Sequence, residues 1–171
     1  MTGGAAERVI VIGVGTEFRC DDGAGPAVIE RLRGTVPADV ELLASDGEPT
    51  RLMETWTDAA VAIVVDAVSG GGAAPGTLHR VVVPGEAAGR DGAPPPGRLA
   101  PTTTPASSHG LGLGAAIELS RALSRLPGQL ILHGVQGEVF GYGQAFSSAV
   151  AAAIDDLTAR VRADVLSVSA S

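Results

Sequence analysis

The chain has 171 residues, of which 45% are hydrophobic and 18% are charged, and its formal net charge is −7. This composition is typical of one folded domain over residues 1–171 and excludes a disordered chain. The negative charge argues against nucleic acid and anionic membrane surfaces as partners, and no apolar stretch approaches the ~18 residues of a membrane span. The first eight residues lack a secretory pattern, and the single cysteine, Cys20, cannot form an internal disulfide. We therefore expect a cytoplasmic protein, and we expect it to be a monomer or a weak homo-oligomer.

Apolar runs alternate with amphipathic stretches, which predicts a mostly parallel sheet with helices on both faces. The continuous apolar run at residues 60–65 predicts a central strand, and the short run after the glycine-rich turn at 70–72 predicts an antiparallel edge strand. The predicted fold class is α/β, a three-layer α/β/α sandwich with about five strands. In chain order we expect strands at residues 8–14, 40–44, 60–65, 77–83 and 129–135, and helices at residues 25–33, 49–57, 111–126 and 147–166.

Two stretches fall outside this alternation. Residues 84–108 are dominated by Pro, Gly, Ala and Thr, so they form neither a helix nor a central strand. A loop of this length is usually functional, or it is a disordered insertion, and the sequence leaves both interpretations open. Residues 167–171 are predicted to be a frayed tail.

The loop between the first strand and the first helix carries two adjacent carboxylates, Asp21 and Asp22, between glycines. In parallel α/β folds this loop lies at the carboxyl edge of the sheet, where ligands bind. A dinucleotide-binding loop would need a third glycine at Phe18, and the acidic pair would repel a pyrophosphate. The loop therefore predicts a site of another kind.

Three chemically capable side chains are predicted to meet at that edge: Asp22, Asp66 after the third strand, and His109 at the entrance to the helix at 111–126. Two carboxylates and one imidazole suit Ni, Zn, Fe or Mn, and ligand type alone does not choose among them. Taken singly, Asp66 also fits a turn or a helix cap, and His109 also fits the neighbour of an N-cap serine. Asp21 is interpreted as the backbone partner and Asp22 as the ligand, although the sequence cannot separate the pair.

Other candidate groups are set aside. His79 and His133 lie inside predicted strands and are interpreted as packed or edge histidines. The carboxylates beside Cys20 disfavour a thiolate there. A serine triad using Ser107 or Ser108 with His109 lacks a nucleophile-elbow pattern.

The same residues belong to segments that resemble the nickel–iron hydrogenase maturation proteases, the C-terminal processing endopeptidases of hydrogenase large subunits. The D-D/E-G-x-G loop, the strand-end aspartate and the S-H-x-x-G-L histidine, in that order, form a fairly specific signature. The matching segments are Val9 to Gly15, Arg19 to Pro26, Asp46-Gly47, Val64 to Ala67, Ser108 to Leu111, Gly137 to Gly143 and Ala145 to Val150.

This resemblance implies an endopeptidase that removes the C-terminal extension of a hydrogenase large-subunit precursor after nickel insertion, with that precursor as its partner. It implies that Asp22, Asp66 and His109 are both the catalytic and the metal-binding residues, acting on nickel presented by the precursor. The isolated protein could hold an adventitious divalent metal at the same residues. Asp46 and Gly47 are expected, by the same resemblance, to place the substrate tail.

Four departures from the family pattern are visible. Asp22 stands where the family often has Glu, Thr16 where it has Asn, and Phe18 where it has Leu. The usual D-G-G-T loop reads Asp46-Gly47-Glu48-Pro49-Thr50. This altered loop favours an alternative, a non-catalytic metal-binding or chaperone-like module on the same fold.

Overall fold

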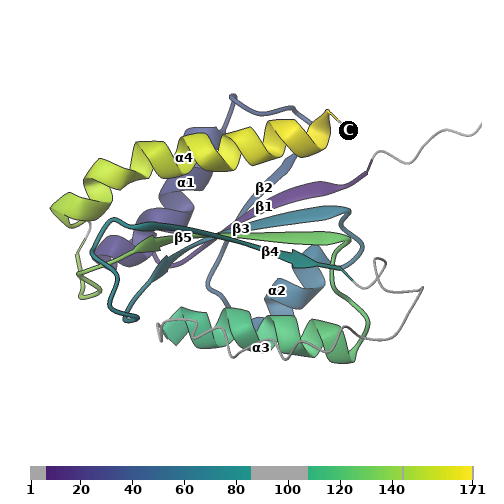
Figure 1. Cartoon of the computed structure of the whole chain (residues 1–171), viewed down its shortest axis with the longest axis horizontal. Helices are drawn as coiled ribbons and strands as arrows, with labels where there is room; N and C mark the ends of the chain where they lie inside the picture. The colour runs from purple at the N-terminus through teal and green to yellow at the C-terminus, as the bar shows by residue number, and fades with distance from the viewer. Residues whose placement is uncertain (1–6, 86–107, 144, 171) are drawn as a thin grey trace, which may run out of the picture.

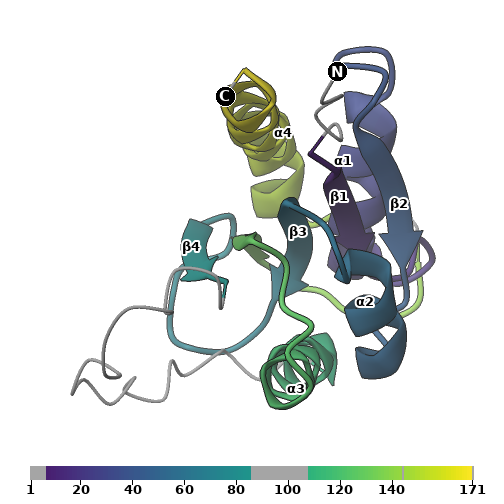
Figure 2. The ribbon, with the colours of Figure 1, turned by 90° about the vertical axis from the view of Figure 1, so that its right-hand side faces the viewer.

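A computed structural model describes residues 7–85, 108–143 and 145–170 (Figure 1). It contains one five-stranded sheet with the strand order β2-β1-β3-β5-β4. Figure 2 shows α1 and α4 on one side of this sheet and α2 and α3 on the other, which confirms the three-layer α/β/α class. The elements are β1 (Val9–Val14), the 3₁₀ helix η1 (Cys20–Gly23), α1 (Ala24–Leu32), β2 (Glu41–Ser45), α2 (Pro49–Trp56), β3 (Val61–Val68), β4 (Leu78–Pro84), α3 (Ser108–Ala122), β5 (Gln129–Gln136) and α4 (Ser148–Ser169).

The middle strand is β3, which pairs in parallel with β1 on one side and with β5 on the other. Its six central residues are all buried, as a strand covered on both faces requires. At one edge, β4 pairs antiparallel with β5, and at the other edge β2 pairs parallel with β1. The expected central strand and the expected antiparallel edge strand are therefore both confirmed.

Successive side chains of each strand point to opposite faces of the sheet and pack in two separate core layers. On one face Val11, Ile63 and Ile131 pack with α1 and α4, and on the opposite face the alternate residues pack with α2 and α3. In the second layer the indole nitrogen of Trp56 donates to Ser120 Oγ at 3.0 Å, so its polar atom is satisfied although the side chain is fully buried. Because side chains alternate in this way, the position of a polar residue along its strand determines whether it faces α1 and α4 or α2 and α3.

Three predicted boundaries are wrong. Asp66 does not follow the third strand but lies inside it, because β3 stays paired with β5 up to Val68. The third helix begins at Ser108 and ends at Ala122, before Ser124 takes a positive φ of 54°. Residues 167–169 continue α4 and are not a frayed tail.

The expectations for the proline-rich segment fall largely on residues 86–107, which lie outside the described residues. Among the helices that the structure does describe, none combines the length and apolarity that a membrane crossing requires.

Candidate active site

The loop between β1 and α1 depends on glycines that allow close backbone approach. Gly15 has a φ of 140°, and a Cβ there would lie 1.8 Å from the carbonyl oxygen of Asp22. In the first turn of α1, a Cβ on Gly25 would lie 2.7 Å from the carbonyl oxygen of Val65. The chain can therefore seat η1 against β3, and the two elements are in contact. This packing places the acidic pair at the carboxyl edge of the sheet.

The adjacent carboxylates of this loop have different partners. Asp21 is fully buried, and its Oδ2 accepts from the backbone N–H of Glu138 at 2.8 Å and of Val139 at 2.9 Å, while Oδ1 accepts from that of Ser147 at 2.7 Å. Burial alone would raise the pKa of Asp21, but these three hydrogen bonds together outweigh it and lower the pKa. Asp21 therefore ties the loop after β1 to the connection between β5 and α4. This geometry agrees with its interpretation as a backbone partner.

Asp22 turns its carboxylate toward its own loop. Its side chain is 3% exposed, and Oδ2 accepts from the backbone N–H of Thr16 at 3.1 Å. This bond closes the loop on itself, whereas the bonds of Asp21 reach the connection between β5 and α4. The role of Asp22 as a ligand stays a prediction.

Asp66 lies near the same edge, on the middle strand β3. It is 3% exposed and shares its face of β3 with Ala62 and Val64, which pack in the layer with α2 and α3. Its register partner in β5 is Gly134. Burying two carboxylates, Asp22 and Asp66, costs folding free energy, and such burial at one sheet edge is typical of functional sites.

The backbone of His109 lies in the first turn of α3, one residue after the helix begins. Because α3 leads into the start of β5, its first turn lies at the opposite, carboxyl edge of the sheet (Figure 1). Nearby, a Cβ on Gly112 would lie 2.5 Å from the carbonyl oxygen of Gly47, which follows β2. The helix start therefore packs against the end of another parallel strand. The side chain of His109 lies outside the described residues.

The predicted substrate-binding residues Asp46 and Gly47 lie between β2 and Glu48, the N-cap residue of α2. Asp46 Oδ1 accepts from the backbone N–H of Glu48 at 3.2 Å, and its other oxygen pairs with Arg51. The hydrogen bond from Glu48 and then the Arg51 guanidinium hold the pKa of Asp46 below its ordinary value. Glu48 itself caps α2 by accepting from Arg51 N–H at 2.8 Å, ahead of Pro49 in the first turn. The residues that depart from the D-G-G-T pattern, Glu48 and Pro49, thus cap and begin α2. Substrate placement by Asp46 and Gly47 stays a prediction.

The three expected ligands therefore come from three elements at one edge: η1, β3 and the first turn of α3. Within the part of the chain that the structure describes, no group of three or more His, Cys, Asp or Glu side chains is arranged to hold a metal ion. The imidazole of His109 lies outside the described residues, so the trio itself stays a prediction.

His79 lies closer to this edge than the sequence indicated. Its register partner is Gly134, which is also the register partner of Asp66, so the three residues form a row across β4, β5 and β3. A Cβ on Gly134 would lie 3.8 Å from His79 Cδ2, so the ring leans over the glycine. Its Nε2 is buried without a hydrogen-bond partner among the described residues. Only the strand register reveals this placement, because 79 and 66 share no sequence pattern.

His133, by contrast, is a packed histidine on the opposite face, as expected. Its Nε2 lies 2.7 Å from Asp164 Oδ2, and Arg80 binds both oxygens of that carboxylate at 2.9 and 3.0 Å. Burial, the largest cause, lowers the pKa of His133 despite the neighbouring carboxylate. His133, Asp164 and Arg80 join β5, α4 and β4, and they have no part in the candidate site.

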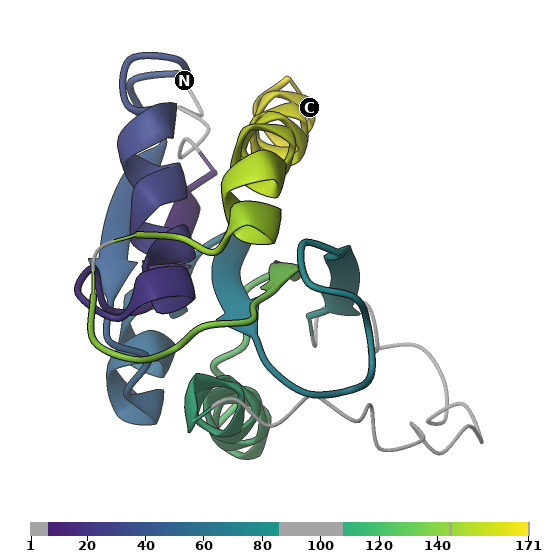
Figure 3. The same ribbon diagram turned by 90° about the vertical axis from the view of Figure 1, so that its left-hand side faces the viewer.

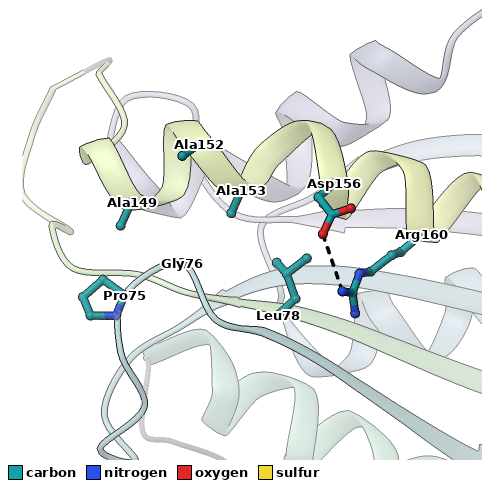
Figure 4. A pocket seen from close by; sticks show the side chains of 8 residues that line it. All are labelled: Pro75, Gly76, Leu78, Ala149, Ala152, Ala153, Asp156 and Arg160. Atoms are coloured by element: carbon teal, nitrogen blue, oxygen red, sulfur yellow. Dashed lines mark ion pairs between the residues drawn. The ribbon is translucent and has the colours of Figure 1, made fainter.

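A hollow of about 430 Å³ lies elsewhere, between α4 and the connection from β3 to β4 (Figure 4). Alanines of α4 and Leu78 line it, and its charged side chains, Asp156 and Arg160, pair with each other at 3.5 Å. It holds no imidazole, thiol or second carboxylate. The hollow therefore offers no chemistry comparable to that of the sheet edge.

The chain is thus an α/β protein with two buried carboxylates at the edge of the sheet where parallel α/β folds commonly bind ligands. A scan against protein-family models finds none that matches the chain. The chain is 32% identical over 152 residues to the hydrogenase expression/formation protein HupD of Rhodobacter capsulatus, an alignment that covers 87% of this chain and 67% of HupD.

Solved structures of hydrogenase maturation proteases share the fold. The maturating endopeptidase HybD of Escherichia coli matches with a TM-score of 0.75 at 24% identity, over 94% of this chain and 93% of HybD. The [NiFe] hydrogenase maturation protease HybD of Thermococcus kodakarensis matches with a TM-score of 0.66 at 18% identity, over 92% and 99% of the two chains. The chain belongs to the hydrogenase maturation protease family, and it is an endopeptidase.

Proposed function

We propose that this endopeptidase removes the C-terminal extension of a nickel–iron hydrogenase large-subunit precursor after nickel has been inserted. The main support is the burial of two carboxylates, Asp22 and Asp66, at the edge where the backbone of His109 also lies. The relatives support the substrate class, since HupD is named a hydrogenase formation protein and HybD a hydrogenase maturating endopeptidase.

Nickel held by the precursor is the recognition element in this proposal. Carboxylate oxygens of Asp22 and Asp66 and an imidazole nitrogen of His109 are ligand types that divalent first-row metals accept. Because these three groups would contact the precursor through its metal, they add affinity for the precursor only when it carries nickel. Cleavage would then be confined to precursors that have received nickel.

Two routes to peptide-bond cleavage fit these residues. In one, nickel held by the precursor would polarise the scissile carbonyl for attack by water; the C–N bond then breaks, and a proton from that water goes to the leaving amine. In the other, Asp22 or Asp66 removes a proton from the attacking water. Both routes need the carboxylates in their charged form, so both predict loss of cleavage when either carboxylate is replaced by an amide.

The test is to incubate the protein with its nickel-loaded or nickel-free precursor and to follow precursor mass by intact mass spectrometry. We expect a C-terminal peptide to be lost only from the loaded precursor, and we expect His109→Ala and Asp66→Asn to abolish that loss. Asp155→Asn is the matched control, because Asp155 is an exposed carboxylate on α4. Cleavage by His109→Ala, or equal cleavage of both precursors, would refute the proposal.

The altered loop from Asp46 to Thr50 supports a second candidate, a module that reads the metal without cleaving. In that case the loop's caps serve α2 alone, and the site binds the loaded precursor as a chaperone would. Tight binding of the loaded precursor with no change in its mass would favour this candidate over the protease.

A further inference from the structure

Aromatic side chains are rare in this chain and gather beside the candidate site. The sequence has only five aromatic residues, three Phe, one Tyr and one Trp. Trp56 is fully buried in the core. The other four lie in the loop after β1 or in the connection between β5 and α4, and they are Phe18, Phe140, Tyr142 and Phe146.

Two of these four aromatic side chains, and the neighbouring Val139, are exposed rather than packed. Phe18 is 59% exposed, Val139 is 44% exposed and Tyr142 is 92% exposed. We refer to these three side chains as the aromatic rim. Phe140 and Phe146, by contrast, pack against the core layer with α1 and α4. The packed pair anchors the connection, while the rim faces outward.

The backbone beneath the rim is firmly held. The N–H of Gly143 donates to the carbonyl oxygen of Phe18 at 2.9 Å, and the N–H of Cys20 donates to the carbonyl oxygen of Gly143 at 2.9 Å. The N–H of Asp21 donates to the carbonyl oxygen of Val139, also at 2.9 Å. Figure 3 shows the connection from β5 to α4 running beside the loop after β1. The rim is thus displayed on two loops that are fixed to each other.

A cation adds to this arrangement. The guanidinium of Arg19 lies 5.7 Å from the centre of the Tyr142 ring, within the range of a cation–π contact. Tyr, Phe and Arg are enriched in the buried centres of protein interfaces, and Tyr and Arg are common among the residues that dominate binding. A ring that is oriented before binding loses less entropy when a partner covers it.

We propose that the aromatic rim is a docking surface for an apolar patch on the folded body of the protein substrate, an inference that rests on the proposed function. The rim is continuous with the candidate site, since Phe18 lies on the loop that carries Asp22 and Val139 is bonded to Asp21. A folded protein that brings a bound metal to Asp22 must cover the side chains around that loop. The rim gives this contact an apolar centre, so it sets affinity for the precursor and leaves the cleavage chemistry unchanged.

The test compares Phe18→Ala, Tyr142→Ala and Tyr142→Phe with Leu166→Ala, a control that removes a side chain of similar exposure on α4 (47%). We expect each alanine variant of the rim to raise the Kd for the nickel-loaded precursor, and the KM of cleavage, at least about tenfold with kcat unchanged. Tyr142→Phe keeps the ring and should bind nearly as the wild type does. Melting temperatures should stay unchanged, because the replaced side chains are exposed.

An unchanged Kd in both alanine variants, or an equal loss in Leu166→Ala, would overturn the docking surface. A concentration-dependent dimer that Tyr142→Ala abolishes would also overturn it, because the rim would then meet a second copy of the chain. A wild-type protein that binds the precursor but does not cleave it refutes the protease proposal, while the Kd comparison still decides the docking surface.

Discussion

Replacing Asp21 or Asp22 by asparagine should affect different properties of the protein, although the two residues are adjacent in one loop. Asp21→Asn and Asp22→Asn each replace one carboxylate oxygen by an NH2 group without a change in shape. Asp21 accepts three backbone hydrogen bonds that hold the connection between β5 and α4. Asp22 accepts from Thr16 within its own loop. We therefore expect the first variant to lose stability and the second to lose cleavage.

The size of the stability loss follows from the bonds of Asp21. An asparagine has one acceptor oxygen, so its NH2 group must face either the N–H of Ser147 or the two N–H groups of Glu138 and Val139. Hydrogen bonds to a charged group are worth about 1.5–3 kcal/mol each, so we expect a cost of about 2–4 kcal/mol. For a chain of this length, such a cost lowers Tm by about 5–15 °C.

Asp22→Asn keeps an oxygen that can accept from Thr16, so we expect it to lose less stability than Asp21→Asn. Its cleavage of the nickel-loaded precursor should fall by about 10²–10⁴-fold, the range of a lost acid–base group. Thermal melting and intact mass spectrometry of the precursor measure the two effects on the same samples. Equal losses of Tm in both variants, or a stable Asp21→Asn that no longer cleaves, would refute this division of roles.

Two further predictions concern the start of α3 and the buried histidine. Gly112→Ala places a Cβ 2.5 Å from the carbonyl oxygen of Gly47, so it should displace the turn that carries His109 and reduce both Tm and cleavage. At Gly114 a Cβ would meet nothing within 4 Å, so Gly114→Ala should raise the free energy of unfolding by about 0.5–1 kcal/mol. Because burial lowers the pKa of His133, the unfolded chain binds a proton that the folded protein does not. Stability should therefore be complete above pH ~6.5 and decrease as the pH falls below it. In His133→Gln this decrease between pH 7 and 5 should be smaller, and an unchanged slope in chemical denaturation would contradict it.

Acid should also reduce stability by protonating Asp21. Its pKa is lower in the folded protein than in the unfolded chain, so the stabilisation it provides is present above its ordinary value and is lost as the pH falls toward the folded pKa. This loss lies at more acidic pH than that of His133, and the Asp21→Asn variant lacks it. Unfolding titrations at pH 3–5 separate the two contributions.

Much of the fold could be read from local pattern. The apolar run at residues 60–65 predicted the central strand, and the close return at 77–83 predicted the antiparallel edge, because strand burial and connection length leave a signature in neighbouring residues. Asp22 and Asp66 could be assigned to one edge for the same reason, since the carboxyl ends of parallel strands share an edge.

The boundaries and the division of roles depended on contacts that no local pattern records. Asp21 is anchored by residues 117 to 126 positions away, so the sequence could not distinguish it from Asp22. His79 joined the row of Asp66 only because both strands align with Gly134, and the exposure of Tyr142 depended on how two distant loops lie together. The sequence by itself determined the element types and the edge that carries the acidic site, because periodicity and turn chemistry act over a few residues. Only the tertiary structure decided which side chain is bonded within the fold and which is exposed, because strand register and loop packing act between segments far apart in the chain.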